Sequence, residues 1–139
     1  MDKVYDTAII GGGLGGLTLS IQLVRAGLTV ILLEKEQYPF NKVCGEYISM
    51  ESWDFLISLG LPLKAMQLPR INQLKITSPS GNTLHTTLGL GGFGISRYTI
   101  DNELKNIAVA SGVIVLENCK AEAPVFKNEI FTISTNNGL

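Results

Sequence analysis

A cluster of glycines near the start of the chain constrains the fold more than any other feature. Five of the six residues from Gly11 to Gly16 are glycine. The cluster follows the apolar run Val4 to Ile10, which predicts a buried strand. It precedes apolar residues spaced three and four apart, which predict a helix ended by Arg25 and Gly27. The run Thr29 to Leu33 predicts a second strand, parallel to the first.

The spacing of the glycines matches the G-x-G-x-x-G pattern at Gly11, Gly13 and Gly16. The first glycine allows a tight turn, the second lets a pyrophosphate approach the backbone, and the third lets helix and strand pack closely. The N-terminus of the following helix offers N–H groups and partial positive charge to the phosphates. Glu34 lies 18 residues after Gly16, where a carboxylate accepts hydrogen bonds from a ribose and repels a 2′-phosphate. The pattern predicts FAD or NAD rather than NADP. The alternative is a glycine turn in an unrelated α/β protein, with Glu34 a solvated strand end.

The rest of the chain predicts further elements of both kinds. A long loop is expected over Glu34 to Ile48, and a flexible connection over Gly89 to Gly94. A hairpin turn is expected at Lys127-Asn128. The remaining expected elements are a helix over 49–59 capped by Ser49 and stopped by Gly60, strands over 74–77, 83–88 and 93–97, a helix over 100–108 stopped by Gly112, and strands over 113–116, 123–126 and 129–135.

Length and composition narrow the class of protein. The 139 residues fit one domain, and 45% apolar content suffices for a packed core. The net charge of −1 with no basic cluster argues against nucleic acid as a partner, and no apolar run is long enough for a transmembrane helix. Cys44 and Cys119 form no metal-binding spacing, so we expect no metal site, and a reducing cytoplasm fits best.

Three segments resemble one family. Residues 6–35 have the glycine pattern of FAD proteins, Lys42 to Glu46 (KVCGE) is similar to the K-x-C-G motif of geranylgeranyl reductases, and Ser96 to Leu104 is similar to an S-R-x-x-x-D-x-x-L segment. The chain therefore resembles the N-terminal part of FAD-dependent oxidoreductases of the geranylgeranyl reductase and aromatic-ring hydroxylase group. The resemblance implies an α/β Rossmann-like FAD-binding domain over residues 1–139, with a parallel sheet and an antiparallel β-meander.

The resemblance also implies roles for individual residues. The glycines Gly11, Gly13, Gly15 and Gly16 would line the pyrophosphate, and Glu34 would hold the adenosine ribose. The other positions implied to contact FAD are Lys35 and Ala121 at the adenine end, Cys44 and Gly45 at the flavin end, and Arg97. Alternatives from the residues alone are a small buried thiol for Cys44 and a surface ion pair for Arg97. No residue is assigned as a catalytic acid or base.

The family resemblance implies a function, with alternatives. The parent enzyme is expected to be an FAD-dependent reductase acting on a small hydrophobic substrate, with NAD(P)H as electron donor and peripheral membrane contact; a flavin monooxygenase or halogenase is the alternative. A non-catalytic FAD- or NAD-binding module is a third reading. A short-chain dehydrogenase is disfavoured, because the only Tyr-x-x-x-Lys spacing, Tyr38 with Lys42, falls in a proline-bearing loop.

The resemblance places the second FAD motif and the substrate domain later in family members than residue 139. We therefore expect the chain to be a truncated part of a larger flavoenzyme. We also expect it to bind FAD weakly and to catalyse no reaction by itself. Its oligomeric state is not predicted.

Overall fold

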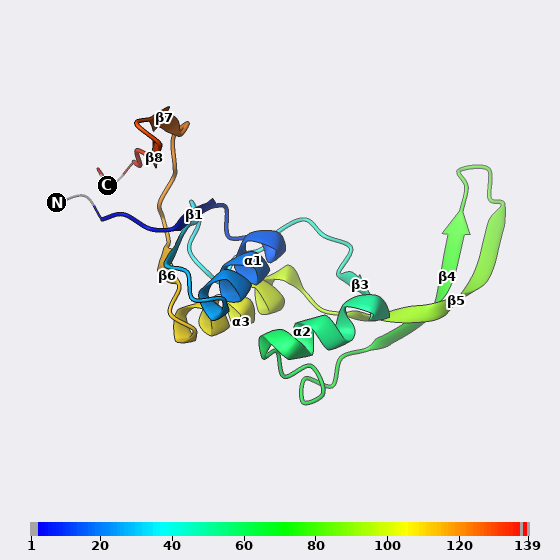
Figure 1. The fold of residues 1–139 in the computed structure, drawn as a ribbon. Helices are drawn as coiled ribbons and strands as arrows, with labels where there is room; N and C mark the ends of the chain where they lie inside the picture. The colour runs from blue at the N-terminus through cyan, green and yellow to red at the C-terminus, as the bar shows by residue number, and fades with distance from the viewer. Residues whose placement is uncertain (1–2, 137, 139) are drawn as a thin grey trace. The chain divides into compact units, whose positions relative to one another are not determined.

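The computed structural model describes residues 3–136 and 138. The chain divides into two compact units, one formed by Met1–Asn41 with Tyr98–Leu139 and the other by Lys42–Arg97. We call them the nucleotide unit and the ribbon unit. Their helices and strands are labelled in Figure 1.

A parallel sheet forms the centre of the nucleotide unit. Its strands are β1 (Thr7–Ile10), β2 (Val30–Leu33) and β6 (Ile114–Leu116), in the order β1-β2-β6. Ile9 lies opposite Leu32 in the first pair, and Leu32 lies opposite Val115 in the second. The predicted strand–turn–helix–strand order is therefore confirmed, and with it the Rossmann-like α/β class.

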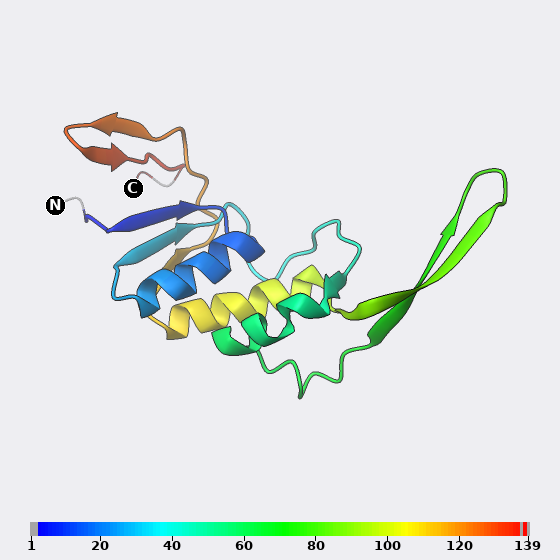
Figure 2. The same cartoon turned by 45° about the vertical axis from the view of Figure 1, so that its right-hand side comes forward.

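Two helices cover one face of this sheet. Figure 2 shows α1 (Leu14–Arg25) and α3 (Arg97–Ala110) side by side along it. The expected ends are confirmed, since Arg25 is the last residue of α1 and Gly27 and Gly112 adopt positive φ just after the helices. Fully buried apolar side chains between helices and sheet form the core: Leu17, Ile21, Leu32, Ile100, Leu104 and Ala108. Their burial supplies most of the driving force for folding this unit.

Strand β1 is less buried than its apolar sequence predicts. Only Ile9 of this strand is buried, whereas Ile10 is 54% exposed and the preceding Val4 is 73% exposed. The reason is topological, because β1 is an edge strand and α1 and α3 lie on one face of the sheet.

A short hairpin follows the parallel sheet. It pairs β7 (Val125–Lys127) with β8 (Ile130–Thr132), and Lys127 lies opposite Ile130. The turn therefore consists of Asn128 and Glu129, both at positive φ, and the predicted Lys127-Asn128 turn is wrong by one residue.

The ribbon unit is built on an antiparallel sheet. Its strands are β3 (Tyr47–Ser49), β4 (Arg70–Thr77) and β5 (Thr83–Gly94), in the order β3-β5-β4. A 3₁₀ turn, η1 (Met50–Ser52), leads into helix α2 (Trp53–Leu59), with Ser49 and Gly60 as the predicted cap and stop. Beyond β3, strands β4 and β5 continue as a two-stranded ribbon (Figure 2). Most residues of this ribbon are exposed.

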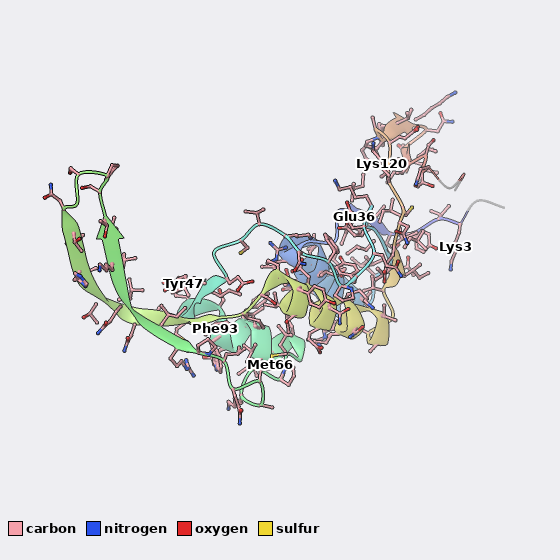
Figure 3. The ribbon with its side chains drawn as sticks, turned by 180° about the vertical axis from the view of Figure 1, so that it is seen from behind. Lys3, Glu36, Tyr47, Met66, Phe93 and Lys120 are labelled. Carbon is pink, nitrogen blue, oxygen red and sulfur yellow. The ribbon has the colours of Figure 1, made fainter. Side chains whose placement is uncertain are left out.

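The expected flexible connection over Gly89 to Gly94 is wrong, and of the expected strand over Phe93 to Arg97 only Phe93 and Gly94 are in a strand. Strand β5 runs through these glycines to Gly94, and α3 begins at Arg97. The glycines serve close strand packing, because a Cβ on Gly92 would lie 2.3 Å from the Tyr47 ring. Figure 3 shows Tyr47 and Phe93 at the end of the ribbon where β3 pairs with β5.

Within residues 3–136 and 138, none of the helices has the length and apolar character needed to span a membrane.

Candidate dinucleotide-binding site

The glycine turn joins β1 to α1 with the geometry that its sequence predicts. Gly11 adopts φ +99°, a conformation that glycine reaches without steric cost, and its N–H donates to the Leu33 carbonyl at 2.8 Å. Gly13 is the N-cap of α1, and its carbonyl accepts from the Leu17 N–H at 2.9 Å. The turn is thus fixed to β2 on one side and to the helix on the other.

Gly16 provides the close contact between helix and strand. A Cβ at this position would lie 2.1 Å from the Gly11 carbonyl oxygen and 3.2 Å from Cγ2 of Ile9 in β1. Both neighbours belong to the turn and its strand, so any side chain here would push α1 away from the sheet.

The outer side of the turn is open. A Cβ added to Gly11 or Gly15 would meet no atom within 4 Å. Helix α1 has no side-chain cap at its N-terminus and no acidic residue in its first turn. Its first N–H groups and its dipole therefore favour an anion at this end. A pyrophosphate fits this donor set, and no side chain of the turn occupies the space beside it.

Glu34 lies at the end of β2 and is buried, with 5% of its surface exposed. One carboxylate oxygen accepts from the Gly12 N–H at 2.8 Å, and the other accepts from the Glu36 N–H at 3.0 Å. Its backbone N–H donates to Leu116, and its carbonyl accepts from Cys119. The Glu34 carboxylate is therefore hydrogen-bonded directly to the glycine turn. Each of its oxygens has a second lone-pair site that a ribose hydroxyl can use.

Sequence reasoning missed two residues of the site: Gly12 in the turn, and Tyr38, which contacts the turn. Tyr38 is buried, and its hydroxyl donates a hydrogen bond to the Gly12 carbonyl oxygen. The glycine at position 12, the second of three consecutive glycines, was the one available signal, since the G-x-G-x-x-G pattern requires no glycine there. Tyr38 follows Glu34 by four residues, and its spacing alone does not reveal the contact.

Two predicted adenine-end residues lie elsewhere in the nucleotide unit. Lys35 is exposed, and its Nζ lies 3.9 Å from a carboxylate oxygen of Glu36. Ala121 is half-buried and forms an isolated antiparallel bridge with Thr135. Their roles toward adenine stay predictions.

The remaining predicted contacts belong to the ribbon unit. Cys44 is exposed, and its sulfur accepts from the Glu46 N–H at 3.4 Å. Gly45 is exposed with no atom within 4 Å of an added Cβ. Arg97 is half-buried at the first turn of α3. Their assignment to the cofactor also stays a prediction.

The parallel sheet, the glycine turn and the acid at the end of β2 together define a dinucleotide-binding protein of the Rossmann type. Within this class, the chain belongs to the FAD binding domain family, which matches residues 4–110. FAD is therefore confirmed as the predicted cofactor.

Proteins similar to this chain include reductases and a halogenase. The chain is 32% identical over 130 residues to digeranylgeranylglycerophospholipid reductase from Sulfolobus acidocaldarius, covering 89% of this chain and 27% of that protein. It is 30% identical over 133 residues to the reductase of the same name from Methanoculleus marisnigri, covering 92% of this chain and 33% of that protein. Among solved structures, the flavin-dependent brominase Bmp2 has 26% identity and a TM-score of 0.79, covering 97% of this chain and 34% of that one. The chain thus spans about a third or less of the length of these relatives.

Proposed function

We propose that the glycine turn binds the ADP part of FAD, and that the whole protein is an FAD-dependent reductase of a hydrophobic, isoprenoid-type substrate. The observation that carries the proposal is the open glycine turn at the N-terminus of α1, which has no side-chain cap. The Glu34 carboxylate is hydrogen-bonded to the same turn. The two reductase relatives support the substrate class, and the similarity extends over the Lys42 to Glu46 segment typical of such reductases.

In this proposal the chain supplies binding, orientation and charge. Gly11, Gly13, Gly15 and Gly16 offer backbone to the pyrophosphate, and Glu34 accepts from the ribose with its remaining lone pairs. The buried Glu34 carboxylate also disfavours a 2′-phosphate, so we expect this turn to prefer FAD or NAD over NADP. Lys35, Ala121, Cys44, Gly45 and Arg97 complete the proposed FAD contacts. Bound FAD would supply the redox chemistry, with NAD(P)H as the external electron donor.

A flavin-dependent halogenase or monooxygenase is the second candidate. The similarity to the brominase Bmp2 favours it, because that match also covers nearly the whole chain at 26% identity. The site residues of the nucleotide unit serve either activity, since both need the same ADP-binding turn.

We also propose a reducing compartment such as the cytoplasm, with peripheral contact to membranes where the substrate is a lipid. Cys44 and Cys119 are both free thiols, which supports this location.

Titration of the purified chain with FAD, NAD and NADP tests cofactor binding. We expect quenching of flavin fluorescence by the chain, competition by ADP, and no competition by 2′-phospho-ADP-ribose at equal concentration. Equal competition by ADP and the 2′-phosphorylated compound would contradict the ribose assignment of Glu34.

The two activities are separated with the whole protein and FAD. A reductase adds two mass units per double bond to an isoprenoid lipid when a reductant is supplied. A halogenase instead incorporates bromide into an electron-rich ring and requires oxygen. Bromide incorporation without double-bond reduction would replace the first proposal by the second.

A further inference from the structure

Both backbone polar groups of Gly12, its N–H and its carbonyl, are hydrogen-bonded to buried side chains. Its N–H donates to the Glu34 carboxylate at 2.8 Å, and its carbonyl accepts from the Tyr38 hydroxyl. Glu34 and Tyr38 are 5% and 6% exposed. Hydrogen bonds in such a buried setting fix orientation strongly, because a buried group that loses its partner gains no water in exchange.

Tyr38, which contacts Gly12, is itself held in place by neighbouring residues. Its backbone N–H donates to the Glu117 carboxylate at 3.0 Å, and its ring packs against Phe40 with the ring centres 5.4 Å apart. Glu117 in turn lies 3.8 Å from the Lys105 ammonium of α3. The hydroxyl is therefore placed by contacts that reach to the end of β6 and to α3.

The position of Tyr38 also explains why residue 12 is glycine. A Cβ on Gly12 would lie 1.8 Å from the Tyr38 hydroxyl oxygen, and 3.1 Å from both Cζ of Tyr38 and Cδ2 of Leu32. The hydroxyl occupies the space of the missing side chain. Gly12 and Tyr38 therefore form a matched pair, separated by 26 residues in sequence.

The direction of the neighbouring peptide group follows from this contact. In a trans peptide, the C=O and the N–H of one unit point in opposite directions. The carbonyl of Gly12 shares its peptide unit with the N–H of Gly13. Because Tyr38 holds that carbonyl toward the protein interior, the Gly13 N–H is directed away from Tyr38, to the opposite side of the turn.

We propose that Tyr38 is a positioning residue of the glycine turn, whose hydroxyl aims the Gly13 N–H at the pyrophosphate of the dinucleotide. The proposal rests on the proposed FAD function. It assigns to Tyr38 no contact with FAD and no chemical step.

The first test compares two tyrosine variants of the chain. Tyr38→Phe removes only the hydroxyl, and Tyr47→Phe is a matched control because the Tyr47 hydroxyl donates to another glycine carbonyl, that of Gly91, at 3.1 Å. We expect Tyr38→Phe to weaken binding of FAD and of ADP by the same factor, about tenfold, and to leave adenosine binding within about twofold. Tyr47→Phe should bind all three ligands as the wild type does.

Equal weakening of adenosine and FAD, or an equal effect of Tyr47→Phe, would overturn the proposal, because either result indicates a general structural effect. Unchanged FAD binding by Tyr38→Phe would overturn it as well.

The second test needs no ligand and therefore separates this inference from the proposed function. We expect Tyr38→Phe to accelerate hydrogen exchange of the Gly12 amide and to shift the Gly13 amide resonance in NMR spectra. We also expect Tyr38→Phe to lower the urea midpoint of the wild type but to raise that of Gly12→Ala, because it removes the 1.8 Å clash. Additive effects of the two substitutions on stability would contradict the pairing. If the wild type binds neither FAD nor ADP while this reversal is observed, the proposed function fails and the role of Tyr38 in the turn stands.

Discussion

Asp6 and Thr29 connect the beginnings of two parallel strands. The Asp6 carboxylate accepts from the Thr29 N–H and from the Thr29 hydroxyl, both at 2.7 Å. These hydrogen bonds hold the pKa of Asp6 below its ordinary value, and the Thr29 hydroxyl has a larger effect than the Thr29 backbone N–H. The ionised form is thus favoured in the folded chain, and this contact depends on pH.

We expect Asp6→Asn to reduce stability at neutral pH and to have less effect in acid. The folded-state pKa is depressed, so the stabilisation by Asp6 is present above the ordinary pKa of 3.8 and is lost as the pH falls through the lower folded-state value. Urea unfolding of the wild type and of Asp6→Asn, at neutral pH and at pH values below the folded-state pKa of Asp6, measures the difference in stability. The exposed Glu122→Gln serves as a control. A difference that stays constant over this range would contradict the assignment.

Gly15 and Gly16 are adjacent and offer opposite predictions. We expect Gly16→Ala to lower the free energy of unfolding by about 1–3 kcal/mol, because its Cβ would collide with the Gly11 carbonyl. Gly15→Ala meets open space and gains helix propensity, so its stability should be unchanged or up to about 1 kcal/mol higher. If the pyrophosphate lies at the open side of the turn, Gly15→Ala nevertheless weakens FAD binding. Chemical denaturation and FAD titration of the two variants measure these effects, and equal stability losses would contradict them.

The sequence predicts the glycine turn well because each of its glycines has a local cause. The strand, turn and helix lie within residues 4–25, and their apolar spacing is visible directly. The contacts of Glu34 and Tyr38 with Gly12 could not be predicted in this way. They join residues that are 22 and 26 positions apart, and only the pairing of β1 with β2 brings them together.

At the scale of elements, the β7–β8 hairpin has an unfavourable turn residue. Asn128 and Glu129 adopt φ of 51° and 62°, and asparagine tolerates this region better than glutamate does. We expect Glu129→Gly to stabilise the hairpin by about 1 kcal/mol relative to Glu129→Ala, which removes the same charge but keeps a Cβ. Slower amide exchange in β7 and β8 of the glycine variant measures the effect. Equal exchange in both variants would contradict it.

Regular elements were predicted where an apolar period was long enough, as in both helices of the nucleotide unit. Strand β3 was missed because it has only three residues, Tyr47–Ser49, and its pairing with β5 is not local. The sequence predicts a flexible connection over Gly89 to Gly94 because glycine usually weakens the interior of a strand. In the structure Gly92 is required by the Tyr47 ring, a partner that residue spacing does not reveal.

At the scale of the whole molecule, the chain is small relative to its family. It spans 27% and 33% of the length of the two reductases reported above, and its turn holds only the proposed ADP end of FAD. We expect the 139-residue chain to bind FAD without turnover. The measurement is NADPH oxidation with FAD and with FAD plus chain. A rate clearly above that of free FAD would contradict this expectation.

The topology of the parallel sheet also sets an order of assembly. Ile31 pairs with Ile114, and the entire ribbon unit, Lys42–Arg97, lies between them in sequence. The ribbon unit is contiguous and can complete its strand pairings from nearby segments, whereas closing a long loop delays β6. During synthesis on the ribosome, β1, α1 and β2 are made before the ribbon unit, and they remain without β6 until the ribbon unit has been made. The parallel sheet that carries the glycine turn is therefore expected to be completed only after the ribbon unit has been synthesised.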